Sequence, residues 1–190
     1  LGQQTFALAD CWRFATVDLA ASTRTSADWT VFSAWARTIT GDLVLLDRVR
    51  ARIGEADHFA HARPLVERWR LDTVFVEASQ HGMTLVREAS NAGVPITPLQ
   101  ADTDKLSRAL PASAWCSNGR VWLPAGVWWV KDWVNEHAAF PNGSHDDQVD
   151  TLAYAVRVAV TRPAPQRSSP ARPQVDAWQP SDIDLATVPL

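Results

Sequence analysis

Three apolar segments joined by short turns open the sequence, and they restrict the fold more than any other feature. The segments WRFATVDLA, WTVFSAWART and LVLLDRVRAR occupy residues 12–20, 29–38 and 43–52. They are rich in the β-branched and aromatic residues that favour strands. Parallel neighbours would need a long crossover between them, and the turns here are too short for one. We therefore expect three strands in an antiparallel meander.

After residue 52 the apolar residues change to helical spacing, and helices alternate with short apolar strands. The pattern predicts helices over residues 55–70, 81–93, 102–118, 127–140 and 145–161, with strands over residues 72–79 and 94–100 and a further short one over 119–124. A meander followed by this alternation predicts an α/β fold, with a mixed five-stranded sheet and helices on its faces.

Composition limits the domain organisation and the class of partner. At 190 residues the chain suits one domain, which we expect at residues 1–161, followed by a Pro/Ser-rich flexible tail at 162–190 with a candidate docking peptide at 178–185. No apolar run reaches the length of a membrane span. Two cysteines make no disulfide framework. The net charge of −3 is not that of a typical nucleic-acid-binding protein.

Carboxylates occur at three points where predicted elements begin or end. Asp18 and Glu77 close two apolar strands, and the last helix opens with Asp146, Asp147 and Asp150. Each acid alone has an ordinary explanation as a turn residue or a helix cap. Together at one sheet edge they would form a hard-oxygen site suited to Mg²⁺ or Mn²⁺. Helical periodicity alone does not choose between Asp146 and Asp147 as the inward-facing residue.

These same segments resemble a known family. FATVDLA, VFVEAS and FPNGSHDDQVDTLAYA look like the nuclease domain of phage large terminase subunits, which has a ribonuclease H-like fold, and DKLSRALPASAWCSNGRVWLP is similar to the stretch between its motifs. The resemblance spans roughly residues 12–160. It implies an endonuclease that cuts concatemeric phage DNA with two divalent cations, Mg²⁺ or Mn²⁺. Carried over by motif, Asp18 and Glu77 are catalytic metal ligands and Asp147 is the third, with Asp146 assisting.

The resemblance also implies partners and a location. These are double-stranded DNA, the terminase ATPase domain, the small terminase subunit and the portal, in the cytoplasm of an infected bacterial host and with no membrane. No GxxxxGK[ST] motif of an ATPase motor occurs in the sequence, which suggests an isolated nuclease domain. Lys105 and Arg108, on one helical face, are candidate phosphate contacts, although a solvated helix face explains them equally well.

The same sequence features allow two other interpretations. A Holliday-junction resolvase-like or other ribonuclease H-like nuclease would keep the fold and change the substrate. A non-catalytic docking module of the packaging machinery would use the acids only as helix caps. Metal binding distinguishes the docking module from either nuclease.

Overall fold

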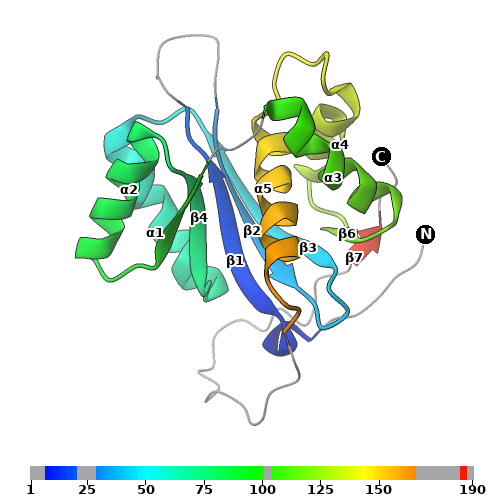
Figure 1. Cartoon of the computed structure of the whole chain (residues 1–190), viewed down its shortest axis with the longest axis horizontal. Helices are drawn as coiled ribbons and strands as arrows, with labels where there is room; N and C mark the ends of the chain where they lie inside the picture. The colour runs from blue at the N-terminus through cyan, green and yellow to red at the C-terminus, as the bar shows by residue number, and fades with distance from the viewer. Residues whose placement is uncertain (1–6, 21–28, 101–103, 166–184, 188–190) are drawn as a thin grey trace.

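A single mixed sheet runs through the centre of the molecule, with helices on both faces (Figure 1). The computed structural model describes residues 7–20, 29–100, 104–165 and 185–187. The strands are β1 Trp12–Asp18, β2 Thr30–Arg37, β3 Leu43–Ala51, β4 Thr73–Glu77, β5 Ile96–Leu99, β6 Val121–Pro124 and β7 Leu185–Thr187. The helices are α1 His58–Trp69, α2 Gln80–Asn91, α3 Lys105–Ser117, α4 Val130–Ala139 and α5 Asp147–Thr161, with short 3₁₀ turns at Leu8–Asp10 and Glu55–Asp57.

The strand order is β5-β4-β1-β2-β3-β6-β7. Strands β1, β2 and β3 form the expected antiparallel meander, and β4 lies parallel to β1 on its other side. This confirms the predicted α/β fold with a mixed sheet.

The predicted count of five strands is too low for the described residues. Strand β6 joins β3 in parallel, and β7 pairs antiparallel with β6. The short strand expected over residues 119–124 is present as β6, but its pairing with β3 depends on packing that the sequence pattern does not show. Residues 185–187 lie in a Pro-rich tail without strand periodicity, and they become a strand because the edge of β6 offers hydrogen bonds. The rest of the expected docking peptide, residues 178–184, falls outside the described residues.

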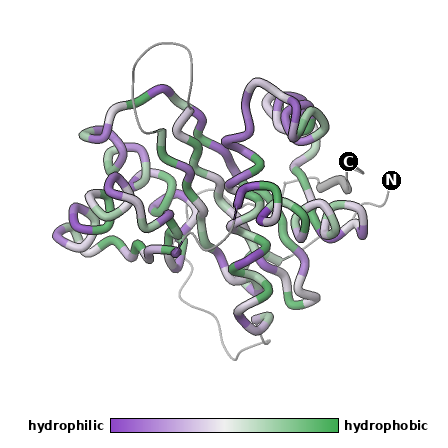
Figure 2. Tube along the Cα trace, turned by 45° about the horizontal axis from the view of Figure 1, so that its top comes forward, coloured by the Kyte–Doolittle hydropathy of each residue, from purple (hydrophilic) through white to green (hydrophobic). Residues whose placement is uncertain are grey.

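Alternation along β1 divides the core into two layers. Phe14 packs with Phe75 of β4 and Leu152 of α5, whereas Val17 packs with Leu85 on the face that carries α1 and α2. Figure 2 shows the hydrophobic stretches running through the central strands. Since even-numbered residues of β1 face α5, Asp18 at its end belongs to the α5 side.

Helix α5 lies across the centre of this face and is almost completely buried. The hydroxyl of Thr16 on β1 donates a 2.7 Å hydrogen bond to the backbone carbonyl of Thr151, and the Thr151 hydroxyl lies 2.9 Å from that of Ser33 on β2. These polar contacts within an apolar interface fix the helix along the strands. They bring the first turn of α5 to the edge at which β1 ends. None of the described helices is long and apolar enough to cross a membrane.

Candidate metal centre

Asp18 and Glu77 end neighbouring parallel strands. Each comes directly after one residue of the last pair that joins the strands, Val17 and Val76. Residues at matching register in parallel strands point to the same face, so both carboxylates lie at one edge on the α5 side. This is the arrangement expected from the two strand ends.

The start of α5 brings two further carboxylates to this edge. Asp147 and Asp150 are buried, with 6% and 5% of their surface exposed. Asp146 precedes the helix, and 38% of its side chain is exposed. The structure thus separates residues that periodicity left equivalent: Asp147 and Asp150 are enclosed, whereas Asp146 lies at the rim.

Asp18 is held among like charges. Burial raises the pKa of Asp18 well above its usual range, and the negative charges of Asp150, Asp147 and Glu77 raise it further. We refer to these four residues, Asp18, Glu77, Asp147 and Asp150, as the carboxylate cluster. Because three negative charges act on the buried Asp18, the cluster favours an added positive charge.

Asp147 carries an oxygen without a hydrogen-bond partner. Its Oδ2 atom is buried and accepts no hydrogen bond, and Nδ1 of the His145 imidazole lies 3.9 Å from it. Burial raises the pKa of Asp147 to about 6, and the charge of Glu136 contributes. A buried carboxylate oxygen left without a partner costs free energy unless a cation or a proton satisfies it.

Helix α3 supplies two cations to the cluster. The ammonium nitrogen of Lys105 lies 2.6 Å from Oδ1 of Asp146 and 2.6 Å from Oδ2 of Asp150. Arg108 lies 3.3 Å from Oδ1 of Asp150 and 4.0 Å from Oε2 of Glu77. Although burial opposes the charge of Lys105, its hydrogen bonds to the two aspartates outweigh burial and raise its pKa. Lys105 and Arg108, the candidate phosphate contacts, therefore form ion pairs with carboxylates in this structure.

Two supporting residues were missed by sequence reasoning. The hydroxyl of Tyr154 donates a hydrogen bond to Oε2 of Glu77. Tyr154 follows Asp147 by seven residues, which is two helical turns, so it shares the face that meets the sheet. That spacing was the only signal in the sequence, because an aromatic residue there equally suits a core position.

Glu136 of α4 is the second residue that was missed. It is buried and accepts hydrogen bonds from the backbone nitrogen of Gln148 at 2.6 Å and from its side-chain amide at 2.7 Å. The guanidinium Nη2 of Arg50 lies 3.0 Å from Oε2 of Glu136. Asp146 holds the N-cap position but makes no capping hydrogen bond with its side chain. Glu136 thus satisfies a free N–H group at the start of α5, which is the role that capping would assign to the aspartates.

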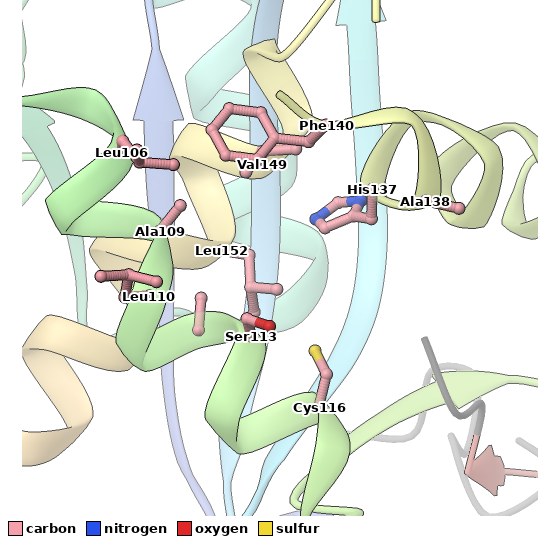
Figure 3. A pocket seen from close by; sticks show the side chains of 11 residues that line it. Leu106, Ala109, Leu110, Ser113, Cys116, His137, Ala138, Phe140, Val149 and Leu152 are labelled. Atoms are coloured by element: carbon pink, nitrogen blue, oxygen red, sulfur yellow. The ribbon is translucent and has the colours of Figure 1, made fainter. Parts of the chain in front are cut away.

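A separate cavity of about 280 Å³ lies between α3, α4 and α5 (Figure 3). It is lined by Leu106, Ala109, Leu110, Ala112, Ser113, Cys116, His137, Ala138, Phe140, Val149 and Leu152. No carboxylate lines it. The cavity is therefore mainly apolar and offers no carboxylate ligand to a hard cation such as Mg²⁺ or Mn²⁺.

The four acids of the carboxylate cluster lie at one edge of the sheet, but they do not form a complete metal-binding geometry. Within the part of the chain that the structure describes, no group of three or more His, Cys, Asp or Glu side chains is arranged to hold a metal ion. Lys105 and Arg108 form ion pairs with the acids, and the hydroxyl of Tyr154 donates a hydrogen bond to Glu77. The cations of α3 partly offset the charges that would otherwise repel one another.

Comparison with known proteins identifies similar folds. The sequence model of a family described as the terminase RNaseH-like domain matches residues 15–157. The large terminase nuclease from thermophilic phage G20c, with bound magnesium, superposes with a TM-score of 0.61 at 20% identity, over 81% of this chain and 84% of that chain. Its structure with bound zinc gives a TM-score of 0.60 at 22% identity, over the same shares of both chains.

A Holliday junction resolvase is also similar. The yeast mitochondrial enzyme superposes with a TM-score of 0.50 at 10% identity, over 81% of this chain and 83% of that chain. No curated protein sequence matches the chain. At these identities the solved structures establish the ribonuclease H-like fold.

Proposed function

Because the chain belongs to the family of terminase RNaseH-like domains, we propose that it is a metal-dependent endonuclease that cuts concatemeric phage DNA during packaging. The observation that carries the proposal is the carboxylate cluster at the edge where β1, β4 and α5 meet. Asp18 lies there among Asp150, Asp147 and Glu77, whose charges raise its pKa. A buried acid crowded by three other carboxylates is an arrangement that clusters at functional sites.

The donor set fits divalent cations. Carboxylate oxygens are the ligands that Mg²⁺ and Mn²⁺ prefer, and the buried Oδ2 of Asp147 lacks any hydrogen-bond partner. Asp18, Glu77 and Asp147 would hold the ions, with Asp146 assisting at the rim. Asp150 is added to the candidates because it is buried and contributes most among the charges that act on Asp18. Bound divalent ions activate water and stabilise the leaving oxygen of a phosphodiester.

Other residues of the chain position these ligands. Tyr154 restrains Glu77 through its hydroxyl, and Glu136 restrains the first turn of α5 through Gln148. His145 stands 3.9 Å from Oδ2 of Asp147, where its ring can orient that carboxylate. Such contacts to ligating groups fix their orientation and raise metal affinity.

Lys105 and Arg108 have two roles in this proposal. Without metal they offset the charges of Asp146, Asp150 and Glu77. When ions take over that neutralisation, both cations can turn toward the phosphates of the substrate. Each phosphate contact of this kind would add to the salt dependence of DNA binding.

The substrate and partners follow from the same proposal. They are double-stranded DNA, the terminase ATPase domain, the small terminase subunit and the portal, in the cytoplasm of the infected host. The role of Glu136 at the start of α5 supports catalysis over a docking module, since the aspartates are not needed as caps.

Plasmid digestion tests the proposed function. Parent protein should nick or linearise supercoiled plasmid with Mg²⁺ or Mn²⁺ and should be inactive in excess EDTA. Asp18→Asn should lower the rate by orders of magnitude, because it removes a ligand. Asp57→Asn is the matched control, since Asp57 is exposed and makes no capping hydrogen bond with its side chain. Cleavage that persists in EDTA would reject the proposal, and a strong preference for four-way junctions would favour the resolvase-like alternative.

A further inference from the structure

A row of three arginines lies along one side of β3. Arg48, Arg50 and Arg52 alternate in sequence, and alternate residues of an extended chain point to the same face. Arg48 and Arg50 reach Oδ2 of Asp132 in α4, at 2.6 Å and 3.0 Å. The row therefore faces the layer that holds α4 and α5.

Tryptophans stack against the row. The guanidinium carbons of Arg50 and Arg52 lie 4.9 Å and 4.4 Å from the ring centre of Trp29. The guanidinium carbon of Arg48 lies 5.9 Å from that of Trp128. We call this set, Trp29, Arg48, Arg50, Arg52 and Trp128, the arginine–tryptophan strip. Stacking fixes the guanidinium planes and leaves their N–H groups directed to the sides.

Two members of the strip are open to solvent. Trp128 is 83% exposed, which is unusual for so large an apolar side chain. Arg52 is exposed, and no carboxylate in the described part of the chain forms an ion pair with it. Arg48 and Arg50, in contrast, are neutralised by Asp132 and Glu136. One end of the strip thus offers an unneutralised cation, and the other end offers a bare aromatic face.

The strip leads to the carboxylate cluster. Ala51 at the end of β3 pairs with Thr30, and the next residue of β2, Val31, pairs with Asp18. The Trp29 ring lies 6.5 Å from the ring of His145, the residue before Asp146. The strip and the cluster therefore share one edge of the sheet.

We propose that the arginine–tryptophan strip is a contact surface for DNA, with Arg52 on a phosphate and Trp128 stacked on an unpaired or frayed base. This inference rests on the proposed nuclease function. It adds a second group of cations for DNA binding to the first group, Lys105 and Arg108 of α3. Arg52, the residue after β3, is four positions along the chain from Arg48, which lies beside Trp128. This spacing is about 13 Å in an extended chain, so both contacts can be made along one DNA strand. Base stacking on tryptophan and charge on phosphate are the usual components of such binding.

A protein partner is the competing explanation, because Trp and Arg also dominate protein interfaces. The unneutralised charge of Arg52 beside a cluster proposed to cut phosphodiesters favours DNA. If DNA binds here, loss of Arg52 must change the salt dependence of binding, whereas a protein-docking surface would leave DNA binding untouched.

Fluorescence anisotropy in EDTA tests the strip without cleavage. The probe is a labelled DNA duplex with a single-stranded overhang, titrated with full chain at several salt concentrations. Arg52→Ala should weaken binding and reduce the slope of log K against log salt by about 0.9, the value of one duplex phosphate contact. Trp128→Ala should weaken binding to the overhang by at least about fivefold, and Trp128→Phe should retain most of the affinity.

Arg63→Ala is the matched control, because Arg63 is exposed on α1, on the other face of the sheet. It should bind as the parent does. Both replaced strip residues are exposed, so the variants should fold, which circular dichroism can verify. Parent-like affinity and salt slope in Arg52→Ala and Trp128→Ala would overturn the strip as a DNA surface, as would a parent that binds no DNA. Plasmid cleavage with metal, measured separately, reports on the nuclease function itself.

Discussion

The ammonium group of Lys105 lies 2.6 Å from Oδ2 of Asp150, so a lysine from α3 neutralises a buried acid of the carboxylate cluster. The same nitrogen also lies 2.6 Å from Oδ1 of Asp146. Lys105 thus bridges the rim of the cluster to its interior. In the absence of a metal ion, it supplies part of the positive charge that the acids require.

Replacing Lys105 with glutamine should therefore destabilise the metal-free protein. The acids lose a counter-charge, and we expect a loss of about 1 kcal/mol, since the pair is only partly exposed. The stabilisation caused by Mn²⁺ should become larger than in the parent, because the ions then relieve more repulsion. Thermal melts with EDTA and with Mn²⁺ measure both effects.

Lys131→Gln is the control for this change, since Lys131 is exposed on α4. It removes the same charge and should alter neither melt. If Lys105→Gln melts like the parent under both conditions, Lys105 does not offset the cluster.

Replacing Tyr154 with phenylalanine should loosen Glu77 without unfolding the protein. The change removes only the hydroxyl that donates to Oε2 of Glu77. Loss of a contact to a ligating group lowers metal affinity or activity by about 10–100-fold, and we expect an effect in that range. The cleavage rate as a function of Mn²⁺ concentration separates weaker metal binding from slower turnover.

A double-mutant cycle with Glu77→Gln checks the route of this effect. If Tyr154 acts through Glu77, the double variant should be no slower than Glu77→Gln alone. Fully additive losses would mean that Tyr154 acts on the site by another path.

Stability should depend on pH through Asp147. Its folded-state pKa, about 6, lies above the usual aspartate value of 3.8, so between these values the folded protein binds more protons than the unfolded chain. The contribution of Asp147 to stability is therefore favourable at low pH and is lost as pH rises through about 6. A difference of about two pKa units corresponds to roughly 3 kcal/mol of stability over this range.

His137 has the opposite effect, because burial lowers its pKa to about 4 and unfolding then takes up protons over a similar range. The comparison must therefore be made between variants. Asp147→Asn should gain stability relative to the parent as pH rises from 4.5 to 7.5, measured by urea unfolding in EDTA. A stability difference that stays constant across this range would show that Asp147 titrates normally.

The fold and the proximity of Asp18 and Glu77 could be predicted from the sequence because they depend on local pattern. Asp18 and Glu77 end apolar strands, and strand alternation with parallel pairing brings such ends together. The choice among Asp146, Asp147 and Asp150 could not be made, since all three lie within one turn of a helix start. Their burial depends on how α5 packs on β1 and β2.

Contacts between elements that are distant in the sequence could not be predicted from its patterns either. Glu136 lies 12 residues before Gln148, and its role depends on how α4 meets the start of α5. Lys105 and Arg108 have the spacing of an exposed helix face, yet α3 packs so that both reach the acids. Periodicity identifies which residues share a face but not what that face meets.

Binding of divalent metal by the carboxylate cluster is tested by the melting temperatures of parent and Asp147→Asn proteins in EDTA and in millimolar Mn²⁺. In EDTA the variant should be at least as stable as the parent, because it carries one less repelling charge. Mn²⁺ should raise the melting temperature of the parent by mass action on the folded state and raise that of the variant much less. If the parent melts at the same temperature with and without Mn²⁺, these carboxylates do not form a metal centre.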